Sequence, residues 1–267
     1  MFNEPSLIPP FDEGTLARFE QGHEIGAIAK LRYPSGVEIP FTKEALKETA
    51  KMLLKKVPLF EATFCHKNSY CKVDILVPVD DECWDLIEVN STTEVKEDHI
   101  PDVAFQRYCL EGTGIKINRC HLMFVNNEYV RKGAIDPNLI LSCEDITSQV
   151  DAEVLNVEEN ISDMLRVIAL KKMPSPSLGD ECVEPSECPV CCTDLPPHSV
   201  TELYRMGKKA YPLMNEGYAK ILDLPAGSKL NDKQKIQVSC IKSGKAHVEP
   251  KLISSWLSKL KYPLYMI

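Results

Sequence analysis

Residues 58–90, PLFEATFCHKNSYCKVDILVPVDDECWDLIEVN, determine the expected fold. Three segments within this stretch, at 58–65, 70–79 and 83–90, have the composition of β-strands. The sequences between them, HKNS and DDE, are short and rich in turn-forming residues. Loops of this length join neighbouring antiparallel strands. The stretch therefore predicts an antiparallel meander of three strands.

The two loop lengths determine which residues face each other across the meander. A four-residue HKNS loop places Glu61 opposite Asp74. A three-residue DDE loop places Asp74 opposite Glu88, and it also places Lys72 opposite Asn90. Side chains alternate between the two faces of a strand, so these five side chains are expected on one face. This register assumes that no β-bulge interrupts the strands.

Three carboxylates in a row across adjacent strands repel one another, so a cation is expected among them. The hard oxygen ligands of Glu61, Asp74 and Glu88 suit Mg²⁺ or Mn²⁺, with water and a substrate phosphate completing the coordination. The chemistry that fits such a site is phosphodiester hydrolysis. The alternative is a solvated acidic face that Lys72 neutralises without a metal.

Helical and strand patterns flank the meander. The expected helices are 12–31, 42–57, 97–114 and 146–172, and the expected further strands lie in 116–130 and 138–147. Gly22 and Gly26 lie four apart in the first helix, which predicts close packing there. Together these elements predict an α/β fold with a mixed central sheet that contains the antiparallel meander and is flanked by helices.

Composition limits the classes of function. The chain of 267 residues has a formal net charge of −8, which argues against broad nonspecific nucleic-acid binding but allows a local basic groove. The acidic, proline-bearing start is unlike a secretory signal, and no apolar run approaches the ~20 residues that span a bilayer. We therefore expect a cytoplasmic protein that does not enter the membrane.

The 11 cysteines divide into two sets. Seven are scattered singly and are expected to be small buried side chains: Cys65, Cys71, Cys83, Cys109, Cys120, Cys143 and Cys240. The other four crowd into a segment rich in proline, serine and acidic residues: Cys182, Cys188, Cys191 and Cys192. The expected organisation is a core at 1–173, a cysteine-rich metal-binding segment at 174–200 and a small helical region at 201–267.

The sequences CKVDIL, WDLIEVN and VAFQ, in this order, resemble motifs II and III and the glutamine motif of RecB-like PD-(D/E)XK nucleases. The likeness covers most of residues 10–195 and is closest to uncharacterised bacterial proteins related to the CRISPR-associated RecB-like exonucleases. The resemblance implies that Asp74 and Glu88 bind the metal and that Glu61 matches the acid of the preceding strand. It also implies that Gln106 helps to hold DNA or to orient the site.

The sequence departs from this family at motif III, where Asn90 replaces the catalytic lysine. Lys72 is the expected substitute cation, and Lys96 is a second candidate. Relatives often carry a histidine at the position of Gly26, and we interpret the nearby His23 as structural. The resemblance therefore implies a weakened metal-dependent DNA nuclease, directed to ends or single strands. The alternative is a catalytically inactive nuclease-fold module that binds nucleic acid for a partner exonuclease domain or protein.

The family also suggests a role for the four clustered cysteines. Its iron–sulfur members use one cysteine before the nuclease core and three after it. Here Cys182, Cys188 and Cys191 resemble the rear three, and Cys192 is the candidate for the fourth ligand of a [4Fe–4S] cluster. Zinc is the alternative metal, with His198 as a substitute ligand. A linker with free thiols is the third interpretation.

Overall fold

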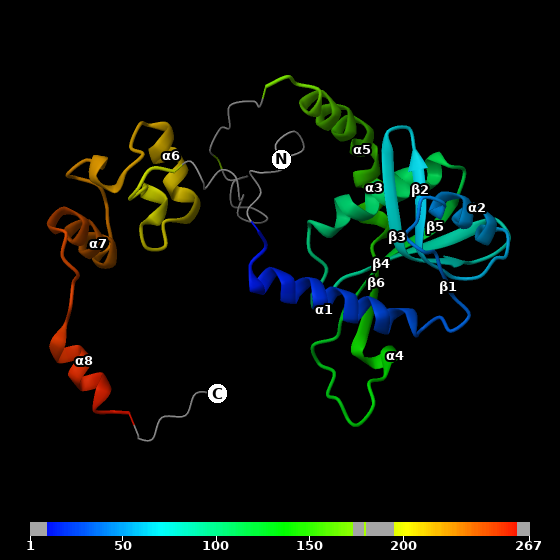
Figure 1. The fold of residues 1–267 in the computed structure, drawn as a ribbon, viewed down its shortest axis with the longest axis horizontal. Coiled ribbons are helices and arrows are strands. Elements are labelled where there is room, and N and C mark those ends of the chain that lie inside the picture. Colours follow the sequence, from blue (N-terminus) through cyan, green and yellow to red (C-terminus); the bar gives the residue numbers. More distant parts are fainter. Residues whose placement is uncertain (1–9, 173–178, 180–194, 261–267) are drawn as a thin grey trace. The chain divides into compact units, whose positions relative to one another are not determined.

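The computed structural model describes residues 10–172, 179 and 195–260 (Figure 1). These residues fall into two compact units, one within 10–172 and the other within 195–260. The first unit contains all of the strands that carry the predicted site. The cluster of Cys182, Cys188, Cys191 and Cys192 lies outside the described residues.

The first unit is built on a six-stranded mixed sheet, in the order β1-β2-β3-β4-β5-β6. The strands are β1 (Val37–Glu38), β2 (Leu59–His66), β3 (Ser69–Pro78), β4 (Cys83–Val89), β5 (Lys116–Val125) and β6 (Leu141–Asp145). Strands β2, β3 and β4 form the antiparallel meander, while β1 runs parallel to β2 and β4 runs parallel to β5. The predicted mixed α/β architecture with flanking helices is confirmed.

The meander has the predicted register. Cys65 pairs with Tyr70 across the first hairpin, and Ile75 pairs with Ile87 across the second. The first turn is tighter than expected, because the ladder continues to His66. The pairs Phe60–Ile75 and Ala62–Val73 flank Glu61 and Asp74, and Glu88 follows the last paired residue, Ile87. The two loop lengths therefore located these three carboxylates at the same level of the sheet.

The assumption of regular alternation is wrong at Glu61. This residue has a φ of 57°, a left-handed conformation that non-glycine residues adopt at a cost in energy. Phe60 and Ala62, on either side of it, pack into different hydrophobic clusters, although residues two apart on a regular strand share one face. The irregularity turns β2 at the level of Asp74.

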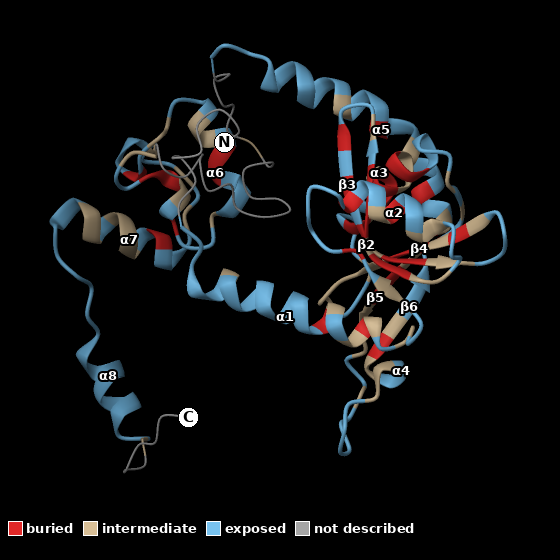
Figure 2. Cartoon of the chain, turned by 45° about the vertical axis from the view of Figure 1, so that its right-hand side comes forward, coloured by how far each residue is buried: buried red, intermediate tan, exposed pale blue. Residues whose placement is uncertain are grey.

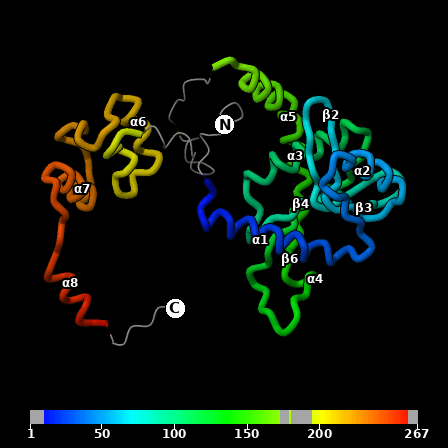
Figure 3. Tube along the Cα trace, in the orientation of Figure 1, coloured from blue at the N-terminus to red at the C-terminus, as the bar shows by residue number. Residues whose placement is uncertain are grey.

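Helices cover both faces of the sheet (Figure 1). Helix α1 (Glu13–Lys30) packs on one face, and α2 (Ala45–Leu53), α3 (His99–Gly112) and α5 (Thr147–Ile168) pack on the other. Figure 2 shows buried residues concentrated in the sheet and in α3, whereas α1 is exposed over most of its length. The chain passes from α3 into β5 and through α4 (Pro137–Ile140) into β6 (Figure 3).

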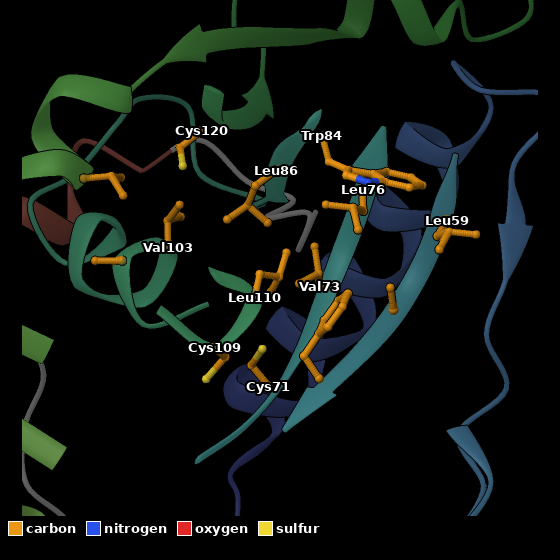
Figure 4. Packing of buried hydrophobic residues seen from close by; sticks show 14 of the residues in the cluster. Leu59, Cys71, Val73, Leu76, Trp84, Leu86, Val103, Cys109, Leu110 and Cys120 are labelled. Atoms are coloured by element: carbon orange, nitrogen blue, oxygen red, sulfur yellow. The ribbon is translucent and has the colours of Figure 1, made fainter. Parts of the chain in front are cut away.

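The larger hydrophobic cluster fills the space between the sheet and α3. Figure 4 shows Val73, Leu86 and Leu110 converging there, and each is fully buried. Burial of such side chains stabilises the fold by about 1.5–3 kcal/mol each relative to exposure. On the other face, Ile25 and Ala29 of α1 are buried in a smaller cluster with residues of β2, β3 and β4. Because only these two residues of α1 are buried against the sheet, other residues of the helix remain available to line a cavity beside it.

Among the seven scattered cysteines, the expectation of burial holds for Cys71, Cys109 and Cys120. It is wrong for Cys65, near the end of β2, and for Cys143, in the middle of the edge strand β6, because both are exposed; Cys83 and Cys240 are partly buried. Cysteine is often buried as a small hydrophobic side chain, but a strand end or an edge strand offers less cover than the centre of the sheet.

The second unit consists of short helices. They are the 3₁₀ turns Val200–Glu202, Gly207–Lys209 and Ile221–Asp223, and the α-helices α6 (Ala210–Asn215), α7 (Asp232–Ser243) and α8 (Pro250–Leu257). Val200, Leu203 and Ile221 are buried within this unit. None of the helices in the described part of the chain is both long and apolar enough to cross a membrane.

Candidate active site

A cavity of about 710 Å³ lies between α1 and the meander. Glu61, Lys72, Asp74 and Glu88 line it, so four of the predicted site residues share one space. The remaining lining residues are Gly22, His23, Gly26, Ala27 and Lys30 of α1, Glu38, Ile39, Pro40 and Phe41 around the end of β1, and Val89 of β4. The cavity is the candidate active site.

The side of the cavity formed by α1 is open because of its glycines. A Cβ atom on Gly22 or Gly26 would meet no other atom within 4 Å, so the predicted close packing of these glycines is wrong. Residues four apart lie on one face of a helix, and here both leave bare backbone facing the cavity. His23, interpreted as structural, is an exposed residue of the same wall.

Asp74 and Glu88 form the half-buried floor of the site. The backbone N–H of Val89 donates to Asp74 Oδ2 at 2.9 Å, and Gln106 Nε2 donates to Glu88 Oε2 at 2.7 Å. Burial raises the pKa of Asp74 to about 6. Burial and the neighbouring charge of Asp74 raise the pKa of Glu88 well above its ordinary value. Two neighbouring, half-buried carboxyl groups do not readily ionise together unless a cation binds between them.

Glu61 has a different environment, because two lysines hold it. Lys30 Nζ lies 2.9 Å from Glu61 Oε1, and Lys72 Nζ lies 2.7 Å from Glu61 Oε2. Burial acts to raise the pKa of Glu61, but hydrogen bonds from the two lysines outweigh it and the pKa is lowered. The neutralisation by Lys72 that we considered as an alternative thus applies to Glu61.

Lys30 is the site residue that the sequence reasoning missed. It belongs to the last turn of α1 and also lies 3.2 Å from Glu38. Its pKa is raised: burial opposes the charge, but hydrogen bonds from Lys30 to Glu61 and Glu38 favour it more strongly. The available signal was its position four residues after Gly26, on the same helical face.

Gln106 reaches the site from α3, on the opposite side of the sheet from α1. Its side chain is buried, and its Nε2 group holds Glu88. Its Oε1 atom is buried without a hydrogen-bond partner. A buried acceptor left in this way carries a free-energy cost of about 1–3 kcal/mol, so a donor such as a bound water is expected beside it.

Asn90 is not among the residues that line the cavity. Its backbone N–H donates to Met123 of β5 at 2.8 Å, and its Oδ1 accepts from the N–H of Thr92 at 3.1 Å. The ladder between β3 and β4 runs from Pro78 to Ile75 and does not extend to the expected pairing of Asn90 with Lys72. The second candidate cation, Lys96, is likewise absent from the cavity lining.

The donor set fits a divalent ion held by two carboxylates more closely than one held by three. Within residues 10–172, 179 and 195–260, no three histidine, cysteine or carboxylate side chains gather closely enough to enclose a metal. Mg²⁺ is commonly bound through one or two carboxylates and several waters. Asp74 and Glu88 supply such a pair, and the unpartnered Oε1 of Gln106 could accept from a water in that shell.

The class of protein that emerges is a mixed α/β protein whose central sheet presents a carboxylate pair to a lysine-lined cavity. Its sequence matches no family model, and no curated protein matches it significantly. The function proposed below therefore depends on the geometry of this cavity and on the resemblance of its motifs.

The raised pKa of Asp74 has a consequence for stability. A carboxyl whose pKa is higher in the folded state stabilises the fold below its unfolded pKa, and this contribution is lost as the pH rises through about 6. In EDTA at pH 7.5, Asp74→Asn is therefore expected to raise the free energy of unfolding by roughly 1–2 kcal/mol, because asparagine keeps an acceptor for Val89. Urea unfolding followed by the fluorescence of buried Trp84 measures this change.

The gain should disappear near pH 3, below the ordinary aspartate pKa of 3.8, where Asp74 is mostly protonated in both the folded and the unfolded chain. Glu128→Gln, at an exposed carboxylate, serves as the matched control and should change little at either pH. Equal stability of Asp74→Asn and the wild type at pH 7.5 would show that the carboxyl is not strained in the metal-free protein.

Proposed function

We propose that this protein is a Mg²⁺- or Mn²⁺-dependent nuclease that hydrolyses phosphodiester bonds in DNA. The observation that carries the proposal is the pair of half-buried carboxylates, Asp74 and Glu88, which share a cavity with two lysines. Turnover is expected to be low, because Asn90 stands where the resembling nucleases have their catalytic lysine. Asparagine can donate and accept hydrogen bonds but supplies no charge.

Each residue has a role in this proposal. Asp74 and Glu88 would hold the metal, and Gln106 would keep Glu88 oriented. A divalent ion there supplies a Lewis acid that polarises a phosphate and lowers the pKa of a bound water. Lys72 and Lys30, which both contact Glu61, would stabilise the negative charge that develops on the phosphate.

The charge balance of the cavity supports a role for a divalent ion. Four carboxylates and two lysines line it, so the cavity has two excess negative charges when all of these groups are ionised. A DNA phosphate is repelled by such a cavity. One divalent cation cancels the excess, which makes metal binding a condition for substrate binding.

The test is to incubate the full chain with end-labelled single-stranded and duplex DNA in Mn²⁺, in Mg²⁺ and in EDTA. Slow cleavage in either metal and none in EDTA is the expected result. If both the wild type and Asn90→Lys are inert in both metals, the nuclease proposal fails. Binding without cleavage would instead favour an inactive nuclease-fold module that serves a partner domain or protein. The absence of Asn90 from the residues that line the cavity favours this alternative.

The cysteine cluster remains a separate proposal. Cys182, Cys188, Cys191 and Cys192 would hold a [4Fe–4S] cluster, with zinc as the alternative metal. A cytoplasmic location agrees with either the reduced thiols or the cluster.

A further inference from the structure

The ring of Phe41 is 81% exposed at the rim of the carboxylate cavity. It also lines a second hollow of about 470 Å³, so it stands where two hollows meet. The other residues of the second hollow are Thr42, Lys43, Ala45, Leu46, Thr63 and Tyr70. Phe41 is the lining residue that the two hollows share, and the surface from the carboxylates past Phe41 to Tyr70 is called the path.

Backbone hydrogen bonds hold the loop that presents Phe41. Thr42 N–H donates to Pro40 O at 2.8 Å, and Ala45 N–H donates to Thr42 O at 3.1 Å. The side chain of Phe41 belongs to neither hydrophobic cluster. Exposing a large apolar ring to water is unfavourable, and the hydrogen-bonded loop keeps Phe41 exposed. A ligand that covers the ring would explain this position.

Cations and a second aromatic ring accompany Phe41. Lys72 Nζ lies 5.8 Å from the centre of the Phe41 ring. Tyr70 is 49% exposed and lies two residues before Lys72 on β3, so their side chains share a face of the strand. Lys43 lines the same hollow as Tyr70. Exposed aromatic rings alternating with lysines are the features that bind unpaired bases and their phosphates.

We propose that this path binds single-stranded DNA, with Phe41 and Tyr70 as the base-stacking residues that select it. The base beside the phosphate in the cavity stacks on Phe41, the neighbouring base lies against Tyr70, and Lys43 contacts a phosphate between them. A duplex cannot use the path, because its bases are already stacked on one another. This inference rests on the proposed function and assigns the residues that give it specificity for single strands.

The first measurement is the binding of fluorescein-labelled oligodeoxythymidine, and of a matched blunt duplex, to the full chain in Ca²⁺, followed by anisotropy. Phe41→Ala is expected to weaken single-strand binding about tenfold and to leave duplex binding unchanged. Phe41→Trp should restore it. Leu155→Ala is the control, because this side chain is 80% exposed on α5, on the other face of the sheet from the cavity wall α1.

An abasic site moved along the oligonucleotide tests the contact itself. One abasic position should weaken binding to the wild type about tenfold and should have no further effect on Phe41→Ala. A second position should show the same coupling with Tyr70→Ala. Additive effects at every position, or equal losses for single-stranded and duplex DNA, would overturn the proposal.

The outcomes separate this inference from the nuclease proposal. If the abasic sites and the substitutions at Phe41 and Tyr70 show coupled losses of binding, but Mn²⁺ supports no cleavage, the binding path is supported and the nuclease proposal is rejected. If the wild type cleaves DNA but Phe41→Ala binds single strands as tightly as the wild type, the nuclease proposal is supported and the binding path is rejected. Absence of both binding and cleavage would reject both.

Discussion

Asp74→Ala is expected to abolish DNA cleavage, with a loss of about 10³-fold or more in turnover. Asp74 is one of only two carboxylates in the cavity that no lysine neutralises. Its loss removes a proposed metal ligand and leaves the Val89 N–H without its acceptor. Single-turnover cleavage of a labelled single strand in saturating Mn²⁺ measures the loss.

Metal binding provides a second readout for the same change. Mn²⁺ should raise the melting temperature of the wild type and have little effect on Asp74→Ala, because binding to the folded state alone stabilises it. The wild-type increase should be larger at pH 7.5 than at pH 5, since the pKa of Asp74 is about 6 and a proton competes with the metal.

Glu61→Gln is the matched comparison. Glu61 lines the same cavity, but Lys30 and Lys72 already hold it, so its loss should lower cleavage far less than that of Asp74. If Asp74→Ala retains the wild-type rate, or if Glu61→Gln is the more damaging change, the two-carboxylate assignment is incorrect.

The part of this site that the sequence predicted depends on local rules. The lengths of two short turns are enough to bring Glu61, Asp74 and Glu88 to one level of the sheet. No contact from elsewhere in the chain is needed for that arrangement. The helices were predictable for the same reason, because their apolar periodicity is a property of neighbouring residues.

The parts that the sequence did not predict depend on distant contacts. Lys30 reaches Glu61 only because Ile25 and Ala29 pack α1 on the sheet, and this packing cannot be deduced from the meander. Asn90 is not among the residues that line the cavity, and its side-chain oxygen accepts from the N–H of Thr92, a contact that the strand pattern does not predict. The left-handed backbone of Glu61 has no marker in the sequence, where glycine or asparagine would be expected.

These distant contacts explain why Glu61 keeps a costly conformation. Its carboxylate accepts from a helix on one side and from a neighbouring strand on the other. The ion pairs thus fix the two lysines beside Asp74 and Glu88 in the absence of any substrate. A phosphate that enters the cavity can compete with Glu61 for either lysine, since both form charge-assisted hydrogen bonds with oxygen anions.

Lys72→Ala is expected to lower cleavage by about 10²-fold, because it removes a cation that would stabilise the charge on the phosphate. The fold should change little. Lys72 is 42% exposed, Lys30 remains to hold Glu61, and a pair at this exposure contributes at most about 1 kcal/mol. The urea midpoint should therefore stay near that of the wild type, while the single-turnover rate falls.

Asn90→Lys decides whether Lys72 has taken over the role of the missing lysine. In the Lys72→Ala background it should restore most of the lost rate, and in the wild type it should raise the rate by no more than about tenfold, because the site already has its cation. A lysine at 90 must extend from the end of β4 past Val89, which lines the cavity, and its long flexible stem allows this.

The matching substitution at Lys30 separates the two cations. Lys30→Ala should reduce the rate less than Lys72→Ala, because Lys30 divides its charge between Glu38 and Glu61 whereas Lys72 bonds Glu61 alone. The opposite order, together with a failure of Asn90→Lys to rescue Lys72→Ala, would transfer the catalytic role to Lys30. The positive charge that the resembling nucleases carry at position 90 would then be supplied by α1, from the other side of the cavity.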